Sequence, residues 1–501
     1  MDQIKFVIPD DPRFGVETLE TIFMMGIESV PWPCQVSRQD EILTIQRNTP
    51  ESGRLLMALP FESFGEIVVS TATLPIKSEP YDLLLELARG EINRLINQLF
   101  NWTEGGLEIA DSLSQEIDQL IERLSGFVFQ EDTTADQRTD QLFDLIEKTQ
   151  LASLQLAKDF CDFVIGLRIQ HDGYIKTLMG FELSPTEMAD PPAKLPDWAR
   201  CITVPLGVPW VSDDTQVGND SDTLKQNTTE SEFVELKTIH STYREQTKLV
   251  CCGPILDFSR KKLPGWLNLE DTFELQRQTA ANLARSFARN FHQSIQLAYV
   301  AAGLNGIETR TLSYPNQLQI TVDMLEGIEN VRSDIPTMVS FDQPWGERLA
   351  WRVGGTHPSN IADSLLRNGL QISCFGLEVN LGYWPHGSLA RGMLQWVELI
   401  DYWSQFGLPL FVILSAPVGS AAEIQGTRGL RKRNTQQQLT EYISNLIPVL
   451  LSKPIVNGIA WRQWNDHSNM RFPLSGLRTA DGEPKETMDL MHKMGQRAYP
   501  G

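Results

Sequence analysis

The sequence predicts an α/β protein in which most of the chain alternates between short strands and helices. Eight short apolar segments follow one another after Gly173, and helical patterns lie between most of them. This number of strand–helix units and this length of chain predict a (β/α)8 TIM barrel over residues 173–501. A doubly wound open sheet would also alternate, but no glycine-rich phosphate loop follows any of the segments.

The eight predicted strands are apolar along most of their length, as expected for strands that are buried on both faces. They span residues 176–181, 201–206, 248–257, 294–302, 336–342, 371–378, 409–414 and 455–460. Apolar residues recur at helical spacing over residues 273–291, 320–331, 361–368, 391–405 and 436–451. The carboxyl ends of the strands of such a barrel meet on one face, and we expect functional residues there.

Two other patterns precede the barrel. Residues 1–80 contain short apolar or alternating runs at residues 4–8, 41–46, 54–59 and 67–73, separated by proline- and glycine-containing turns, which predicts a small β-sandwich-like domain. From Tyr81 to residue 172 the apolar spacing becomes helical, which predicts a helical connector. A sandwich of this size either binds carbohydrate or packs against its neighbour, and we favour the structural role.

Composition excludes several classes of partner. The formal net charge of −21 over 501 residues argues against nucleic acid and against an anionic membrane surface, because both favour positive charge. No basic segment followed by an apolar stretch opens the chain, and no run of about 18 apolar residues suggests a membrane span. The six cysteines form neither a disulfide framework nor a CxxC site, so we expect a cytoplasmic protein with reduced thiols.

Two charged stretches are predicted to be loops. Residues 211–235 are acidic and rich in Ser, Thr and Asn, which is typical of an exposed loop. A basic run at Arg428, Arg431, Lys432 and Arg433 follows the seventh predicted strand. It is either a solvated loop or a lid over an anionic or polymeric substrate.

The end of the eighth predicted strand carries a cluster of aromatic and titratable residues. Residues 455–460 are apolar and run directly into this cluster, which comprises Trp461, Arg462, Trp464, Asp466 and His467. Tryptophan rings can stack on sugars, and the other three side chains can hydrogen-bond hydroxyl groups. The alternative is a capped strand followed by a polar turn.

Carboxylates and tryptophans also follow the fifth and sixth strands. Asp342, Trp345 and Glu347 follow the fifth, and Glu378, Asn380 and Trp384 follow the sixth. Two carboxyl groups that flank a glycosidic bond are the machinery of glycoside hydrolysis. Most of these residues also have a structural interpretation: a buried ion pair for Glu378, a turn cap for Asp342, an exposed loop position for Glu347, and packing for the tryptophans.

Other catalytic patterns are absent from the sequence. It contains neither a nucleophile elbow with a Ser-His-Asp order nor an HExxH motif or cluster of His and Cys that would propose a metal. We therefore expect no metal and no cofactor.

Three segments resemble glycoside hydrolase family 10, the family of xylanase-like barrels. Trp461 to Ser468, followed by Leu477, Asp481-Gly482 and Pro484-Lys485, resembles its eighth-strand signature. Gly376-Leu377-Glu378-Val379-Asn380 looks like its sixth-strand region, where a GLQ-type motif follows a helix. Gly253 to Asp257, with Leu263 to Leu267 downstream, is similar to its third-strand segment, and the resemblance covers residues 176–490.

The resemblance implies a catalytic glutamate at the ends of the fourth and seventh strands. Here these strands continue as Leu297 to Asn305 and Phe411 to Pro417, and neither contains a carboxylate. The chain therefore resembles a divergent branch that lacks both usual catalytic glutamates. Either the chemistry has moved to Asp342, Glu347, Glu378 or Asp466, or the barrel binds sugar without cleaving it.

The leading hypothesis is a glycoside hydrolase of the endo-1,4-β-xylanase type that acts on β-linked oligo- or polysaccharide. Its catalytic residues would be Glu378 with Asp342 or Glu347. The alternative is a carbohydrate-binding pseudoenzyme without activity. A third interpretation, an unrelated barrel enzyme for a small intracellular metabolite, draws on the apparent absence of a secretion signal. The sequence does not specify an oligomeric state.

Overall fold

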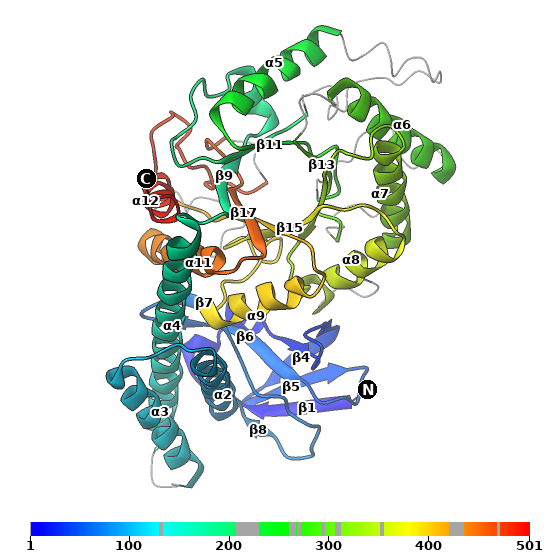
Figure 1. Cartoon of the computed structure of the whole chain (residues 1–501). Helices are drawn as coiled ribbons and strands as arrows, with labels where there is room; N and C mark the ends of the chain where they lie inside the picture. Colours follow the sequence, from blue (N-terminus) through cyan, green and yellow to red (C-terminus); the bar gives the residue numbers. More distant parts are fainter. Residues whose placement is uncertain are drawn as a thin grey trace.

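The computed structural model describes residues 2–129, 134–206, 230–259, 267, 272–291, 296–305, 312–350, 355–419, 435–467 and 471–500. The chain forms a parallel barrel, two small sheets and a helical segment that lies along both (Figure 1). No helix in these residues is long and apolar enough to cross a membrane.

Eight parallel strands close into a barrel, which confirms the predicted fold class. They are β9 (Leu178–Glu182), β10 (Cys201–Val204), β11 (Leu249–Cys252), β13 (Leu297–Ala302), β14 (Thr337–Asp342), β15 (Cys374–Asn380), β16 (Leu410–Ser415) and β17 (Val456–Trp461). Each strand pairs with the next in chain order, and β17 returns to pair with β9. A two-residue strand, β12 (Leu256–Asp257), also pairs with β13. All eight barrel strands overlap the predicted segments.

Helices alternate with the strands and cover the outside of the barrel (Figure 1). They are α5 (Glu230–Gln246), α6 (Phe273–Phe291), α7 (Tyr314–Glu329), α8 (Pro358–Arg367), α9 (Met393–Ser404), α11 (Gln436–Ser452) and α12 (Glu486–Ala498). Strands β13, β14, β15 and β16 are buried along their whole length because helices cover one face and the barrel interior covers the other.

Alternation along the strands divides the apolar residues between two clusters. One set faces the helices and belongs to the main core, whereas the other faces the barrel axis. The axial set comprises Cys201, Cys251, Leu297, Tyr299, Ala302, Met338, Cys374, Phe411, Ile413 and Ala460. Close packing leaves no space at Gly180, where a Cβ would lie 1.8 Å from the carbonyl oxygen of Cys201. The barrel is therefore a filled core below its polar carboxyl-terminal face.

The amino-terminal strands form two four-stranded sheets. One has the order β4-β5-β1-β8 and the other β3-β2-β6-β7. The strands are β1 (Asp2–Val7), β2 (Phe23–Met25), β3 (Pro31–Trp32), β4 (Cys34–Gln39), β5 (Ile42–Arg47), β6 (Arg54–Phe61), β7 (Gly65–Ser70) and β8 (Tyr81–Asp82). Apolar residues from both sheets share one core, including Ile4, Phe6, Leu43, Ile45, Leu55 and Met57. This arrangement is consistent with the predicted sandwich, and β1, β5, β6 and β7 overlap the predicted runs.

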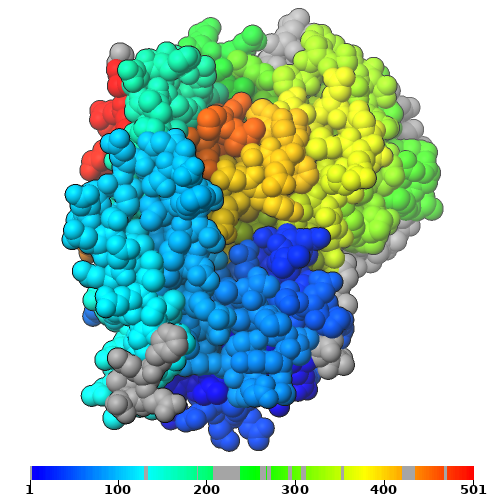
Figure 2. All heavy atoms as spheres, turned by 60° about the horizontal axis from the view of Figure 1, so that its bottom comes forward, coloured from blue at the N-terminus to red at the C-terminus, as the bar shows by residue number. Residues whose placement is uncertain are grey.

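Three helices follow the sandwich: α2 (Leu83–Glu104), α3 (Asp111–Phe129) and α4 (Ala135–Asp172). Asp82 caps α2 by accepting a hydrogen bond from the amide of Leu85 at 3.1 Å. The long α4 contacts α2 and α3 on one side and the barrel helices α9 and α11 on the other. Figure 2 shows this helical segment, in cyan, beside both the blue sandwich and the yellow and orange part of the barrel.

The sandwich also contacts the barrel directly. Phe23, Met25, Leu56 and other sandwich residues form one buried cluster with Trp384 and Leu389, which follow β15. The amide of Val68 in β7 donates a hydrogen bond to the carbonyl of Ala390 at 2.8 Å. The loop after β15 is therefore part of a domain junction.

The two charged stretches lie mostly outside the described residues. This holds for 211–229 of the acidic stretch and for the basic run at Arg428, Arg431, Lys432 and Arg433. Residues 230–235 are described, and they begin α5. Their assignment to a loop was wrong because polar composition alone does not exclude a solvated helix.

Candidate functional site

Glu378 lies at the carboxyl-terminal face of the barrel, near the end of β15, and is fully buried. Its Oε1 accepts hydrogen bonds from the amide of Gly303 at 2.8 Å and from the hydroxyl of Ser340. Tyr299 donates to the same oxygen at 3.4 Å. Oε2 accepts from Nη2 of Arg462 at 2.5 Å. Buried carboxylates require such compensation, so this carboxylate is held firmly in place.

Arg462 connects Glu378 with a second carboxyl group, that of Glu182. Nε of Arg462 lies 3.7 Å from Oε2 of Glu182, while its Nη2 contacts Glu378. Glu182 is the last residue of β9, and its side chain is 12% exposed. Its Oε1 is buried and has no hydrogen-bond partner among the described residues. One guanidinium therefore serves two carboxyl groups, of which Glu182 is the less well compensated.

The environment of Glu182 favours its protonated form. Burial raises the pKa of Glu182 to about 7, and the negative charges of Glu378 and Asp257 add to this, while Arg462 opposes it. Burial and the charge of Glu378 also raise the pKa of Tyr299 well above its ordinary value, so its hydroxyl keeps its proton. Near neutral pH, Glu182 can therefore give or take a proton. We call Glu182, Arg462, Glu378, Tyr299 and Ser340 the mouth cluster.

Asp342 lies beside Glu378, because the two residues are paired in register on β14 and β15. Its Oδ2 accepts from Arg348 at 2.9 Å and from Arg471 at 3.1 Å. Its Oδ1 accepts from the side-chain amide of Asn380 at 3.0 Å. Asp342 is fully buried. The two predicted catalytic residues Glu378 and Asp342 therefore both lie at the mouth of the barrel, where cations or amides already bond to their carboxylates.

Glu347 is not part of this group. It begins the short 3-10 helix η6 (Glu347–Ala350), which contacts β3 of the sandwich. Its Oε1 accepts from Nη2 of Arg391 at 3.0 Å, and the Arg391 guanidinium lies over the rings of Phe23 and Trp345. Burial raises the pKa of Glu347, and Arg391 opposes this. The residue therefore belongs to the domain junction.

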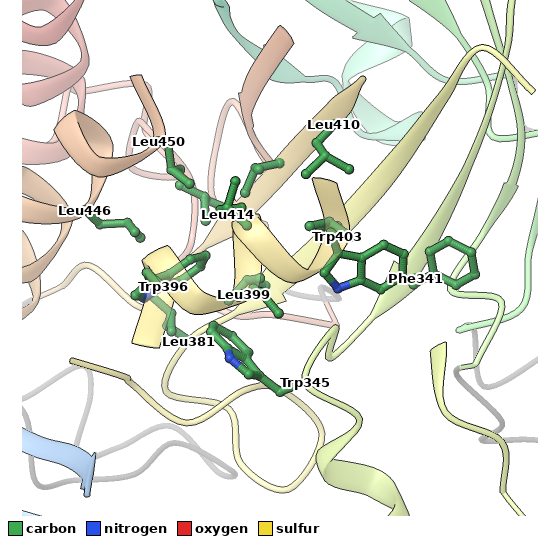
Figure 3. Close-up of a cluster of buried hydrophobic side chains, with 14 of the residues drawn as sticks. Phe341, Trp345, Leu381, Trp396, Leu399, Trp403, Leu410, Leu414, Leu446 and Leu450 are labelled. Carbon is green, nitrogen blue, oxygen red and sulfur yellow. The ribbon is translucent and has the colours of Figure 1, made fainter. Parts of the chain in front are cut away.

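The two predicted sugar platforms after β14 and β15 are packed inside the protein. Trp345 makes an edge contact with Trp396 of α9, with ring centroids 4.8 Å apart, and Figure 3 shows it below α9 among buried apolar side chains. Trp384 lies in the cluster that joins the sandwich to the barrel. Both are 8% exposed, so neither offers a free ring face of the size that a sugar needs.

The tryptophans after β17 are also structural. Trp461 is buried, and its Nε1 donates to the carbonyl of Ser475 at 2.6 Å. Trp464 stacks on Phe181 with a centroid distance of 4.4 Å, and the guanidinium of Arg478 lies over it. Together they attach the polar segment after β17 to the barrel.

Asp466 and His467 hold the same segment from its other side. Asp466 accepts from the amide of Gly476 at 2.7 Å and forms an ion pair with Lys485. Nε2 of His467 lies 3.6 Å from Oε1 of Glu187, and the His467 side chain is 33% exposed. Asp466 is therefore engaged within the loop, whereas His467 is the most exposed of the predicted binding residues.

Sequence reasoning missed Glu182, although it directly follows the first predicted strand. A systematic reading of all eight strand ends would have included it. Tyr299 was also missed, because it lies inside an apolar run in β13 and reads as a core residue. Arg348 lies in the short helix η6 and Arg471 in a loop, and neither of these partners of Asp342 carries a sequence signal.

The ends of β13 and β16 contain no carboxylate, as the sequence indicates. Gly303 follows β13 and donates its amide hydrogen to Glu378. Ser415 ends β16, and its hydroxyl donates to Oδ1 of Asn380 at 2.7 Å. At the two positions where the resemblance implies catalytic glutamates, the barrel thus supplies hydrogen-bond donors to the residues of β15. In the described part of the chain, no three or more His, Cys, Asp or Glu side chains are grouped to hold a metal ion.

The fold is similar to that of many solved xylanases, although no protein-family model and no curated protein matches the chain. Xylanase 10B from Thermotoga maritima is 12% identical, with a TM-score of 0.44, over 64% of this chain and 97% of that one. The endo-1,4-β-xylanase from Caldicellulosiruptor owensensis is 11% identical, with a TM-score of 0.45, over 64% of this chain and 96% of that one. Xylanase 10B from Thermotoga petrophila, solved with xylobiose, is 12% identical, with a TM-score of 0.43, over 64% of this chain and 95% of that one. Matches of this extent say nothing about the chemistry of the mouth cluster.

Proposed function

We propose that the chain acts on a β-linked saccharide at the mouth cluster, with Glu182 as the group that donates and accepts the proton. One observation carries this proposal: a carboxyl group with a pKa near 7 and an unpartnered oxygen among the described residues lies beside a second carboxylate. Pairs of carboxyl groups with different environments are what glycoside hydrolysis requires. The resemblance of residues 461–485 to xylanase-like barrels supports a xylan-type sugar as the substrate class.

In this proposal the two carboxyl groups have different tasks. Glu182, protonated near neutral pH, would give its proton to the oxygen of the leaving sugar as the glycosidic bond breaks. A water molecule would then add to the anomeric carbon and give a proton back to Glu182, which restores the carboxyl group. Glu378 would keep its negative charge close to the developing positive charge on the sugar ring, because Arg462, Gly303 and Ser340 fix its position. Glu347, which lies at the domain junction, has no catalytic role in this proposal. Asp342 is a neighbour that orients Asn380.

A second function, saccharide binding without cleavage, is favoured by one specific observation. The guanidinium of Arg462 contacts both carboxyl groups, where a hydrolase needs space for the reacting bond. Two arginines also neutralise Asp342. Side chains whose charges are compensated in this way can donate hydrogen bonds to sugar hydroxyls and accept hydrogen bonds from them. They do not supply a nucleophile or a base.

The decisive experiment measures reducing-sugar release from a panel of β-linked oligosaccharides that includes xylo-oligosaccharides. The wild type is compared with Glu182→Gln and Glu378→Gln, and with Glu347→Gln as a matched control from the domain junction. The hydrolase proposal expects release by the wild type and by the control, and a loss of at least a hundredfold in the two mouth variants. Activity that is unchanged in Glu182→Gln would refute the assignment of the proton donor.

A calorimetric titration of the same sugars distinguishes the second function. Binding by the wild type without any release, retained in Glu182→Gln, would establish a binding protein. Neither release nor binding with any sugar of the panel would overturn both proposals for a saccharide of this class.

A further inference from the structure

A pocket that several charged side chains line lies where the sandwich, the connector helix α2 and the barrel helix α9 meet, remote in sequence from the mouth cluster. We call it the junction pocket. Its cavity volume is about 40 Å³, which exceeds the roughly 10–15 Å³ that one water molecule needs. Three guanidinium groups line it, those of Arg54, Arg94 and Arg391, together with Gln395 and one carboxylate, Glu398.

Within the described part of the chain, Arg54 has no carboxylate partner closer than 4.0 Å. Its nearest is Oε2 of Glu398 at 4.0 Å, and Glu398 is 40% exposed. Nη2 of Arg54 donates to the hydroxyl of Ser29 at 3.1 Å and approaches the weakly accepting sulfur of Met25 at 3.3 Å. Nε is buried and has no hydrogen-bond partner among the described residues. Burial and the positive charges of Arg94 and Arg391 lower the pKa of Arg54, which shows that its charge is poorly compensated.

The other two arginines have closer carboxylate partners, and Glu398 is shared between Arg54 and Arg94. Arg94 contacts Glu91 at 2.7 Å and Glu398 at 2.9 Å. Arg391 contacts Glu347 at 3.0 Å, but its own Nε is buried and lacks a partner within the described part of the chain. Two residues that line the pocket, Arg54 and Arg391, therefore each have a buried N–H donor for which the described residues provide no acceptor. Such donors are costly to bury and favour an anionic ligand.

We propose that the junction pocket binds a small oxyanion, of the class that includes phosphate and simple carboxylates. The anion would accept hydrogen bonds from Nε of Arg54 and Nε of Arg391. Its negative charge would offset the positive charge of Arg54, which the distant Glu398 balances poorly. The side-chain oxygen of Gln395, buried and without a partner among the described residues, adds an acceptor for a hydroxyl such as that of hydrogen phosphate. Because Arg54 belongs to β6 and Arg391 to the segment before α9, the bound anion would link the sandwich to the barrel.

The test titrates inorganic phosphate into the full chain by calorimetry at pH 7 and constant ionic strength, with separate titrations of sulfate, acetate and chloride. We expect saturable binding of at least one oxyanion and none of chloride. The melting temperature should rise with that oxyanion, because a ligand of the folded state stabilises it. No saturable binding of any of the three oxyanions by the wild type would overturn the proposal.

Variants locate the binding. Arg54→Gln should weaken binding of the oxyanion at least tenfold. Arg54→Lys keeps the charge but loses the fork of donors, so its affinity should lie between those of the wild type and Arg54→Gln. Arg89→Gln is the matched control, because Arg89 lies on the same helix as Arg94 but pairs with Glu86 and is 44% exposed. Unchanged affinity in Arg54→Gln, or an equal loss in Arg89→Gln, would refute the assigned site. If Arg54→Gln does not fold, Arg54→Lys and the wild-type titration still decide.

Discussion

Replacing Glu182 by glutamine should change how the stability of the protein depends on pH. In the unfolded chain this carboxyl group ionises near its ordinary pKa of 4.5, whereas in the folded protein burial raises the pKa to about 7. Between these two values the folded state holds one more proton than the unfolded state. The group therefore contributes stability that is complete below pH 4.5 and is lost as the pH rises through 7.

The magnitude follows from the size of the pKa shift. At about 1.4 kcal/mol per unit of pKa, the difference between 4.5 and about 7 corresponds to roughly 3 kcal/mol. Glutamine has nearly the same shape and does not ionise. The variant should therefore match the wild type near pH 4.5 and exceed its unfolding free energy by up to about 3 kcal/mol at pH 8.

Urea unfolding at half-unit steps from pH 4.5 to 8 measures this difference. The control is Glu483→Gln, which removes an exposed carboxyl group in the turn before α12 and should show no such divergence. A Glu182→Gln curve that runs parallel to the wild type across the whole range would refute the argument, because the shifted ionisation would then be absent.

Three further predictions concern the mouth, the junction and the barrel wall. Glu378→Gln removes one partner of a buried ion pair and should cost about 3–5 kcal/mol of unfolding free energy. Because the negative charge of Glu378 raises the pKa of Glu182, the alkaline limb of the pH–activity profile should also move to lower pH in this variant. Trp384→Ala should cost about 3–5 kcal/mol in urea unfolding but leave saccharide affinity unchanged, since the ring packs at the domain junction; a selective loss of affinity would contradict this. Gly180→Ala should lower the unfolding free energy by about 3 kcal/mol, because its Cβ would meet the carbonyl of β10, whereas Gly126→Ala on α3, with nothing within 4 Å, serves as the control and should be neutral or slightly stabilising.

The barrel was predictable because its strands are buried on both faces. A continuous apolar run such as residues 409–414 leaves a signal in the sequence itself, and the structure places β16 there. The sandwich strands β2 and β3 were missed because three and two residues are too few to show alternation. β4 was missed because most of its side chains are exposed, so it has no apolar face to detect.

The site was less predictable because its contacts are long-range. Glu182 and Arg462 are separated by most of the barrel, and only its closure brings them together. The tryptophans Trp345 and Trp384 follow strands as sugar platforms would, yet the packing of α9 and of the sandwich buries them. The position of a residue at a strand end can therefore be read from sequence, but the direction that its side chain takes cannot.

The long helix α4 makes the amino-terminal part indispensable to the barrel. It packs against α2 and α3 and also against the barrel helices α9 and α11 (Figure 1). A shortened chain that begins at the first barrel strand would expose the apolar faces of α9 and α11 to water and lose the cover of Trp384. Unlike a carbohydrate-binding module on a linker, this amino-terminal part cannot be removed or exchanged as a cassette. A library that grafts or truncates domains should preserve residues 1–172 with the barrel.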